Sequence, residues 1–151
     1  MQISNLLMGR QYPIILIIDD SKAFREFAKY SIREDIKFVN IFQASTGVEG
    51  LQLFLKYKPD VILLDWKMPG IDGLTVLEAI VKDDPATKVI MTTAYDDDQN
   101  LINDMMKRGA FSFVPKPMNR INLLKVIADA LRERKNSKFY GQIIPKKIES
   151  V

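Results

Sequence analysis

The chain contains no cysteine and no histidine among its 151 residues. The lack of cysteine excludes disulfide bonds, thiolate metal sites and thiol nucleophiles. The lack of histidine excludes Ser-His-Asp hydrolysis, imidazole zinc sites and formation of phosphohistidine on this chain. Any chemistry must therefore use Asp, Glu, Lys, Ser, Thr or Tyr, and the oxygen atoms in this set favour hard cations such as Mg²⁺.

Long hydrophobic runs are also absent from the sequence. The longest strongly apolar stretch, at 13–18, is far too short to cross a bilayer, and residues 1–8 lack the positively charged flank of a signal peptide. We therefore expect a cytoplasmic protein without membrane insertion. Hydrophobic residues make up 47% of the chain and charged residues 27%, which is typical of one globular domain at this length.

Net charge is low, at +3, and the excess lies near the C-terminus. Residues 135–151 contain four lysines and one glutamate, whereas residues 1–134 contain equal numbers of acidic and basic residues. The folded part is therefore neutral, which argues against nucleic-acid binding by the domain. We expect an N-terminal extension at 1–12, one domain at 13–134 and a basic tail at 135–151.

Apolar runs typical of strands alternate with segments of helical periodicity throughout the expected domain. This alternation predicts βα units and a parallel sheet. The expected strands are 14–18, 38–43, 61–64, 88–91 and 111–114. Ser21, Thr46 and Asp72 can cap the first three helices, and the helix after Thr46 is expected to bury Val48, Leu51, Phe54 and Leu55. Five such units are too few for an eight-stranded barrel and favour an open, doubly wound sheet.

Four of the expected strands end at residues that can handle a phosphoryl group. Asp19 and Asp20 follow the first strand, Asp65 the third, Thr93 the fourth and Lys116 the fifth. Parallel strands place these ends along one edge of the sheet, where ligands bind in open α/β folds. Carboxylates about 4 Å apart repel by roughly 4 kcal/mol, so a cluster of three demands a cation such as Mg²⁺ or protons.

These residues and their neighbours resemble the receiver domain of two-component response regulators. The similarity covers about 13–134 and keeps the family's order and spacing. Its elements are Asp19-Asp20, Asp65 followed by Met-Pro-Gly-Ile-Asp-Gly at 68–73, Thr93-Ala94, Gly109-Ala110 and Lys116-Pro117. The resemblance implies a flavodoxin-like sheet of five parallel strands in the order 2-1-3-4-5 with five helices. It also implies a phosphoprotein that acts as a signalling switch and is not an enzyme.

By that resemblance, Asp65 accepts a phosphoryl group. The donor would be a phosphohistidine on a sensor histidine kinase or on a histidine phosphotransfer protein. Asp20, Asp65 and the backbone carbonyl of Lys67 would bind Mg²⁺ directly, and Asp19 would act through water. The reaction would therefore depend on Mg²⁺.

The resemblance also assigns the response to phosphorylation. Thr93 and Lys116 would contact the phosphoryl oxygens. Phe113 stands where many receivers have a switch tyrosine; it can swing inward with Thr93 but lacks a hydroxyl to hydrogen-bond a partner. Output is expected through the fourth and fifth helices, toward a downstream protein or a second copy of the chain.

Three other functions fit parts of the pattern. A Mg²⁺-dependent aspartyl phosphatase of the haloacid dehalogenase type also uses a strand-end aspartate, but it needs a second acid two residues later, where this chain has Lys67. A nucleotide-binding domain needs a Gly-rich phosphate loop after the first strand, which the sequence lacks. The third is a receiver that forms part of a longer DNA-binding transcriptional regulator. The seventeen residues after Arg134 are too few for a winged helix. We therefore expect either a stand-alone receiver or the receiver of a longer regulator whose DNA-binding domain starts after Val151, and both stay open.

Lys67 and Tyr95 suggest a hypothesis about the lifetime of the phosphoryl group. They lie two residues after the phosphoacceptor and the switch threonine, and at 65–73 and 93–95 the chain is similar to single-domain sporulation phosphorelay receivers. Bulk and charge at these positions would obstruct in-line attack by water. We therefore expect Lys67→Asn and Tyr95→Ala to lose the phosphoryl group faster than the native protein in a dephosphorylation time course. Unchanged or slower loss in both variants would contradict the hypothesis.

Overall fold

The computed structural model describes residues 12–94 and 98–134. Most of the expected N-terminal extension, Tyr95 and the expected basic tail lie outside these residues. Strands and helices alternate as the sequence predicts. The elements are β1 (Ile14–Ile18), α2 (Lys22–Asp35), β2 (Asn40–Ala44), α3 (Gly47–Tyr57), β3 (Val61–Asp65), α4 (Gly73–Asp83), β4 (Lys88–Thr93), α5 (Gln99–Lys107), β5 (Ser112–Pro115) and α6 (Arg120–Arg134).

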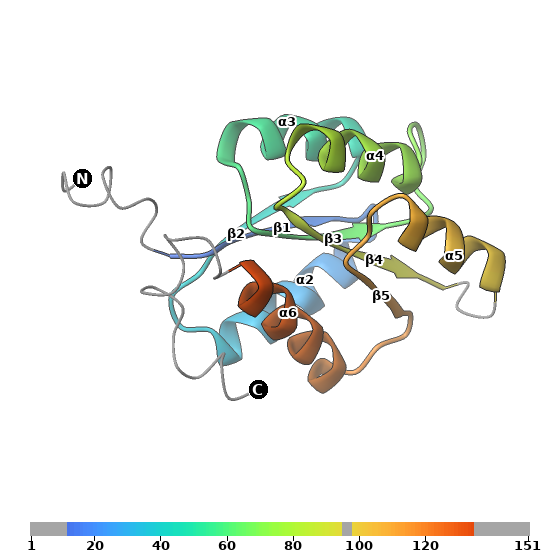
Figure 1. The fold of residues 1–151 in the computed structure, drawn as a ribbon. Helices are drawn as coiled ribbons and strands as arrows, with labels where there is room; N and C mark the ends of the chain where they lie inside the picture. Colours follow the sequence, from blue (N-terminus) through green and yellow to red (C-terminus); the bar gives the residue numbers. More distant parts are fainter. Residues whose placement is uncertain (1–11, 95–97, 135–151) are drawn as a thin grey trace.

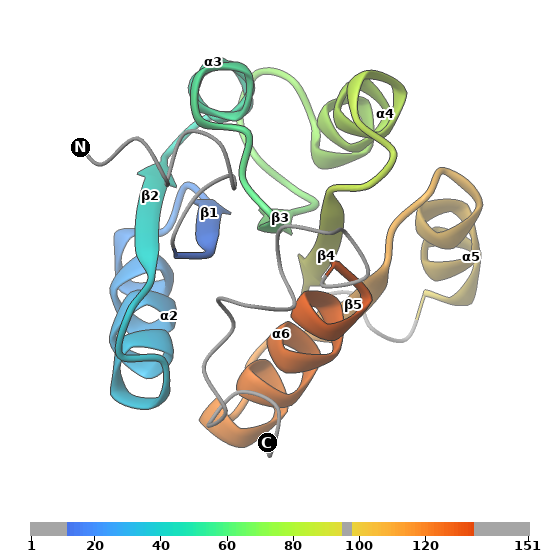
Figure 2. The same ribbon diagram turned by 60° about the vertical axis from the view of Figure 1, so that its left-hand side comes forward.

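The five strands form one parallel sheet in the order β2-β1-β3-β4-β5, which confirms the expected order (Figure 1). Helices α2 and α6 cover one face of the sheet, and α3, α4 and α5 cover the other, as Figure 2 also shows. β3 lies in the centre and all of its residues are buried, which explains its unbroken apolar run. Within the described residues, no helix is long and apolar enough to cross a membrane.

Polar side chains cap the starts of all five described helices; at α6, Oδ1 of Asn119 accepts a hydrogen bond from the N–H of Asn122 at 2.8 Å. The side chains of Ser21, Thr46, Asp72 and Asp98 each accept a hydrogen bond from the backbone N–H three residues later, at 2.8 to 3.2 Å. Each bond satisfies a donor that the helix itself leaves unpaired. The three caps expected from the sequence are therefore confirmed, and two of them, Ser21 and Asp72, begin helices that follow the aspartates at the strand ends.

The expected buried face of α3 is wrong at two positions. Val48 and Leu55 are 57% and 56% exposed, whereas Phe54 is buried. The cause is Gly50, at which an added Cβ would lie 2.5 Å from Cδ1 of Ile18. The backbone of α3 therefore approaches the sheet closely on its glycine side, and this turns the outer apolar residues toward solvent.

The second strand begins later than expected, at Asn40 in place of residue 38. Phe38 lies in the loop before β2, is 50% exposed, and stacks on Tyr12 with ring centroids 5.3 Å apart. β2 is an edge strand whose central residues are only partly buried, so the apolar pattern marks its ends less sharply than those of β3.

Gly73 shapes the loop after β3. Its N–H donates to the carbonyl oxygen of Trp66 at 2.8 Å, and an added Cβ would lie 2.4 Å from the carbonyl oxygen of Asp65. Only glycine allows this close approach. Because of this contact, the start of α4 packs directly against the end of β3. The packing holds the backbone that carries Asp65 in place.

We expect Gly73→Ala to destabilise the fold by about 1 to 3 kcal/mol, because the methyl group would overlap backbone atoms that cannot move aside without shifting β3. Urea unfolding measures the change. Gly70→Asn is the control, because Gly70 has a φ of +83° with open space around it and asparagine tolerates that region. Equal losses of stability in the two variants would contradict the close-approach explanation.

Candidate functional site

Three carboxylates meet at the carboxyl edge of the sheet. Asp19 and Asp20 follow β1, Asp65 ends β3, and β1 pairs directly with β3. Carboxylate oxygens of the three residues all lie within 4.8 Å of one another. Asp19 is fully buried and Asp65 is 7% exposed, whereas Asp20 is open to solvent. The acidic cluster is therefore accessible from one side.

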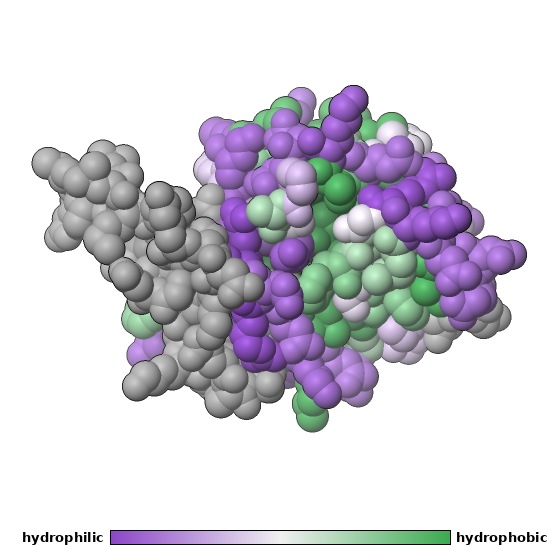
Figure 3. Space-filling view, viewed as in Figure 1, coloured by the Kyte–Doolittle hydropathy of each residue, from purple (hydrophilic) through white to green (hydrophobic). Residues whose placement is uncertain are grey.

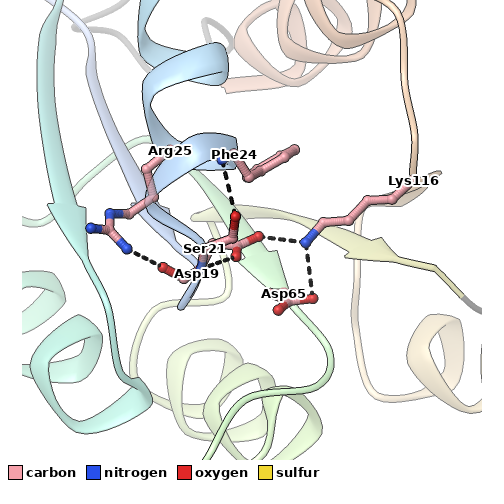
Figure 4. A network of polar contacts seen from close by, with 6 residues as sticks. All are labelled: Asp19, Ser21, Phe24, Arg25, Asp65 and Lys116. Carbon is pink, nitrogen blue, oxygen red and sulfur yellow. Dashed lines mark hydrogen bonds and ion pairs between the residues drawn. The ribbon is translucent and has the colours of Figure 1, made fainter.

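Lys116 brings positive charge to this cluster. Its Nζ lies 2.7 Å from Oδ2 of Asp19 and 3.4 Å from Oδ1 of Asp65, and Figure 4 shows the ammonium between the two carboxylates. The backbone N–H of Lys116 donates to the carbonyl oxygen of Thr93 at 2.7 Å. Pro115, which ends β5, lies on an edge strand, where the missing N–H is tolerated.

Backbone and arginine contacts hold Asp19 in place. Its Oδ1 accepts a hydrogen bond from the N–H of Ser21 at 2.8 Å. Arg25 donates from a terminal nitrogen to the carbonyl oxygen of Asp19 at 2.7 Å and from Nε to Oε1 of Gln43 at 3.3 Å. Arg25 is not among the site residues expected from the sequence. Its position in the first turns of the helix after an acidic pair is the signal that could have found it.

The environment disfavours ionisation of Asp65. Burial, followed by the nearby negative charge of Asp19, raises the pKa of the Asp65 carboxyl from its ordinary value of 3.8 to about 6, although Lys116 acts in the opposite direction. The carboxyl of Asp65 is therefore harder to ionise than that of an exposed aspartate, even with Lys116 beside it. A raised pKa at a clustered carboxylate in an open site is typical of functional positions.

Two of the remaining predicted site residues, Thr93 and Phe113, lie in the neighbouring strands β4 and β5. Thr93 ends β4 and is 1% exposed. Phe113 is partly buried in β5 and pairs in register with Met91, two residues before Thr93, so Thr93 and Phe113 have side chains on the same face of the sheet. Lys67 is exposed, two residues beyond Asp65. Tyr95 lies outside the described residues.

The family of the chain follows from this fold and from sequence comparison. A family model for the response regulator receiver domain matches residues 15–128. The chain belongs to the response regulator receiver family. Members of this family are signalling switches that interact with histidine kinases and downstream targets, and they bind Mg²⁺ at an acidic aspartate cluster of the kind formed here by Asp19, Asp20 and Asp65.

Individual relatives support this assignment. A chemotaxis protein CheY from Listeria monocytogenes is 35% identical over 118 residues, which are 78% of this chain and 98% of the relative. A solved CheY-like receiver domain protein from Methanospirillum hungatei has a TM-score of 0.76 and 30% identity over 83% of this chain and 98% of its own. A receiver domain from Clostridium thermocellum has a TM-score of 0.75 and 32% identity, with coverages of 82% and 98%.

The raised pKa of Asp65 predicts a pH-dependent stability. Because the folded value, about 6, lies above the ordinary value of 3.8, ionisation of Asp65 destabilises the fold as the pH rises through this interval. In EDTA at pH 8, we expect Asp65→Asn to be more stable than the native protein by on the order of 2 kcal/mol. This difference in the free energy of unfolding should become smaller toward pH 4, when urea unfolding is repeated at lower pH. A difference independent of pH, or a less stable variant at pH 8, would contradict the prediction.

Proposed function

We propose that this chain is a phosphoacceptor receiver, which takes a phosphoryl group from a phosphohistidine partner onto Asp65 and signals through protein contacts. The observation that carries the proposal is the placement of Asp65, buried beside Asp19 and within 3.4 Å of the Lys116 ammonium. This arrangement supplies a nucleophilic carboxylate together with a cation for the developing charge. The family membership supports the same function.

The acidic cluster fits Mg²⁺. Oxygen ligands from one or two carboxylates, with the remaining positions left to water and phosphate, suit this ion, and Asp20 keeps one side of the cluster open. We propose Asp20, Asp65 and the backbone carbonyl of Lys67 as its direct ligands, with Asp19 acting through water. When bound, the ion would supply the positive charge that the three carboxylates and the phosphoryl oxygens share.

The chain's own residues account for the transfer. An oxygen of Asp65 forms the P–O bond as the P–N bond of the donor breaks, and the imidazole nitrogen leaves with the electron pair. The Lys116 ammonium, already held by Asp19 and close to Asp65, is placed to contact a phosphoryl oxygen. The hydroxyl of Thr93 would contact another, and Phe113 on the same face of the sheet would follow Thr93 inward.

The output surface is proposed to be the face formed by α5, β5 and α6. Figure 3 shows hydrophobic surface over β4 and β5, between α5 and α6, bordered by hydrophilic residues. β5 is an edge strand in the described sheet and carries the partly buried Phe113. Surface of this kind suits contact with a downstream protein or with a second copy of the chain.

A receiver within a longer transcriptional regulator is the second candidate. The transcriptional regulatory protein DegU of Brevibacillus brevis is 32% identical over 76% of this chain, which spans only 49% of that relative. Protein-glutamate methylesterases also match, and in that from Pyrococcus horikoshii the chain spans 34% of the relative. The same receiver chemistry would then control an attached domain.

Labelling with a small phosphodonor tests the function. Incubation with acetyl phosphate and Mg²⁺ should attach one acid-stable, base-labile phosphoryl group to the native protein, detected by intact mass, and EDTA should prevent it. Asp65→Asn should abolish the label because the amide cannot act as the nucleophile. Asp83→Asn, an exposed position at the end of α4, should label as the native protein does. Undiminished labelling of Asp65→Asn would remove the assignment.

A further inference from the structure

The aromatic ring of Phe24 covers a third side of the Lys116 ammonium. Nζ of Lys116 lies 4.5 Å from the centroid of this ring, in addition to its contacts with Asp19 and Asp65. Figure 4 shows the Phe24 side chain, at the start of α2, beside the end of the Lys116 side chain. An ammonium at this distance from an aromatic ring is attracted by the electron density of the ring.

Asp19, Ser21, Phe24 and Lys116 contact one another in a closed cycle. The carboxylate of Asp19 accepts from the N–H of Ser21, and the hydroxyl of Ser21 accepts from the N–H of Phe24 at 3.2 Å. The ring of Phe24 then faces the ammonium of Lys116, which returns a hydrogen bond to Asp19. The acid that binds the lysine therefore also helps to place the ring that faces it.

The ring is itself held in place from the other side. Phe24 is partly buried and packs, with Met118, against the apolar core between the sheet and helices α2 and α6. It also forms part of the wall of a hollow of about 460 Å³ beside Ala94 and Pro117. A ring anchored in this way gives the lysine a fixed surface to pack against. Without such a surface, the lysine side chain rotates about four bonds, and it loses this conformational entropy when its ammonium is held in one position.

We propose that Phe24 is a positioning residue, which holds the Lys116 ammonium between Asp19 and Asp65 so that it meets the phosphoryl group there. The expected effect of Phe24 on the rate of phosphorylation rests on the proposed function of Asp65. The contact between ring and ammonium does not, because it exists in the unphosphorylated protein. The two parts therefore have separate readouts.

The first readout is the rate of Mg²⁺-dependent labelling by acetyl phosphate. Phe24→Leu keeps an apolar side chain but removes the ring, and we expect it to slow labelling about fivefold, the factor that a typical partly buried cation–π contact supplies. Phe24→Tyr, which retains the ring, should stay close to the native rate. A control is Phe38→Leu, which removes an exposed ring 5.8 Å from Nζ of Lys37 in the loop before β2, and should leave the rate unchanged.

The second readout is the NMR resonance of the Lys116 ε-methylene group, which the ring current of Phe24 shifts. In Phe24→Leu, this resonance should move to the position of a lysine without an aromatic neighbour, and in Phe24→Tyr it should return. Phe38→Leu should leave it in place. A general loss of packing would not give this pattern, and thermal unfolding of each variant identifies such a loss. If Phe24→Leu does not fold, Phe24→Met, which also lacks a ring, replaces it.

The outcomes separate the two proposals. An unmoved Lys116 resonance in the ring-free variant overturns the positioning role, whether or not Asp65 is phosphorylated. A native labelling rate in that variant also overturns it, provided that the label depends on Asp65. If labelling proves independent of Asp65, the proposed function fails, and the resonance alone decides whether Phe24 places Lys116.

Discussion

The contact of Lys116 with Asp19 is the interaction on which the carboxyl edge of the sheet depends. Asp19 is fully buried, and a buried carboxylate without a partner destabilises a fold by several kcal/mol. Its ammonium partner comes from a residue 97 positions later in the chain. The site is therefore complete only when β5 has joined the sheet beside β4. The ion pair then links the residues that follow β1 and β5, two strands that do not pair with each other.

That ammonium is not enough to neutralise the cluster. Among the described residues it contacts two of three carboxylates, and the pKa of Asp65 stays raised in spite of it. A bound cation, or protonation of one carboxylate, would relieve the repulsion among the three carboxylates. The same shortage of positive charge that lowers the stability of the fold would therefore favour the cation and the phosphoryl transfer proposed for this edge. Such a conflict between stability and function is common at active sites.

The sequence predicted the features that have local signals. Polar residues at strand ends and the caps Ser21, Thr46 and Asp72 lie within a few residues of the pattern that reveals them. The strand order came from family resemblance, because local periodicity does not show which strands are neighbours. The buried face of α3 was wrong because Gly50, which adds no hydrophobicity, decides how closely the helix lies on the sheet. The contacts of Arg25 with Asp19 and Gln43 depend on tertiary placement and were missed.

The positions of the strands in the sheet separate the residue proposed to react, Asp65, from the strand proposed to respond, β5. β3, which carries Asp65, is paired on both sides and wholly buried, so it gives the proposed nucleophile a rigid support. β5 pairs in the described sheet with β4 alone, and its residues are mostly only partly buried. An edge strand can shift while the ladders of the central strands stay intact. The backbone N–H of Lys116 is hydrogen-bonded to the carbonyl oxygen of Thr93. Under the proposed function, a displacement of either residue would therefore reach β5 directly, and through it the surface between α5 and α6.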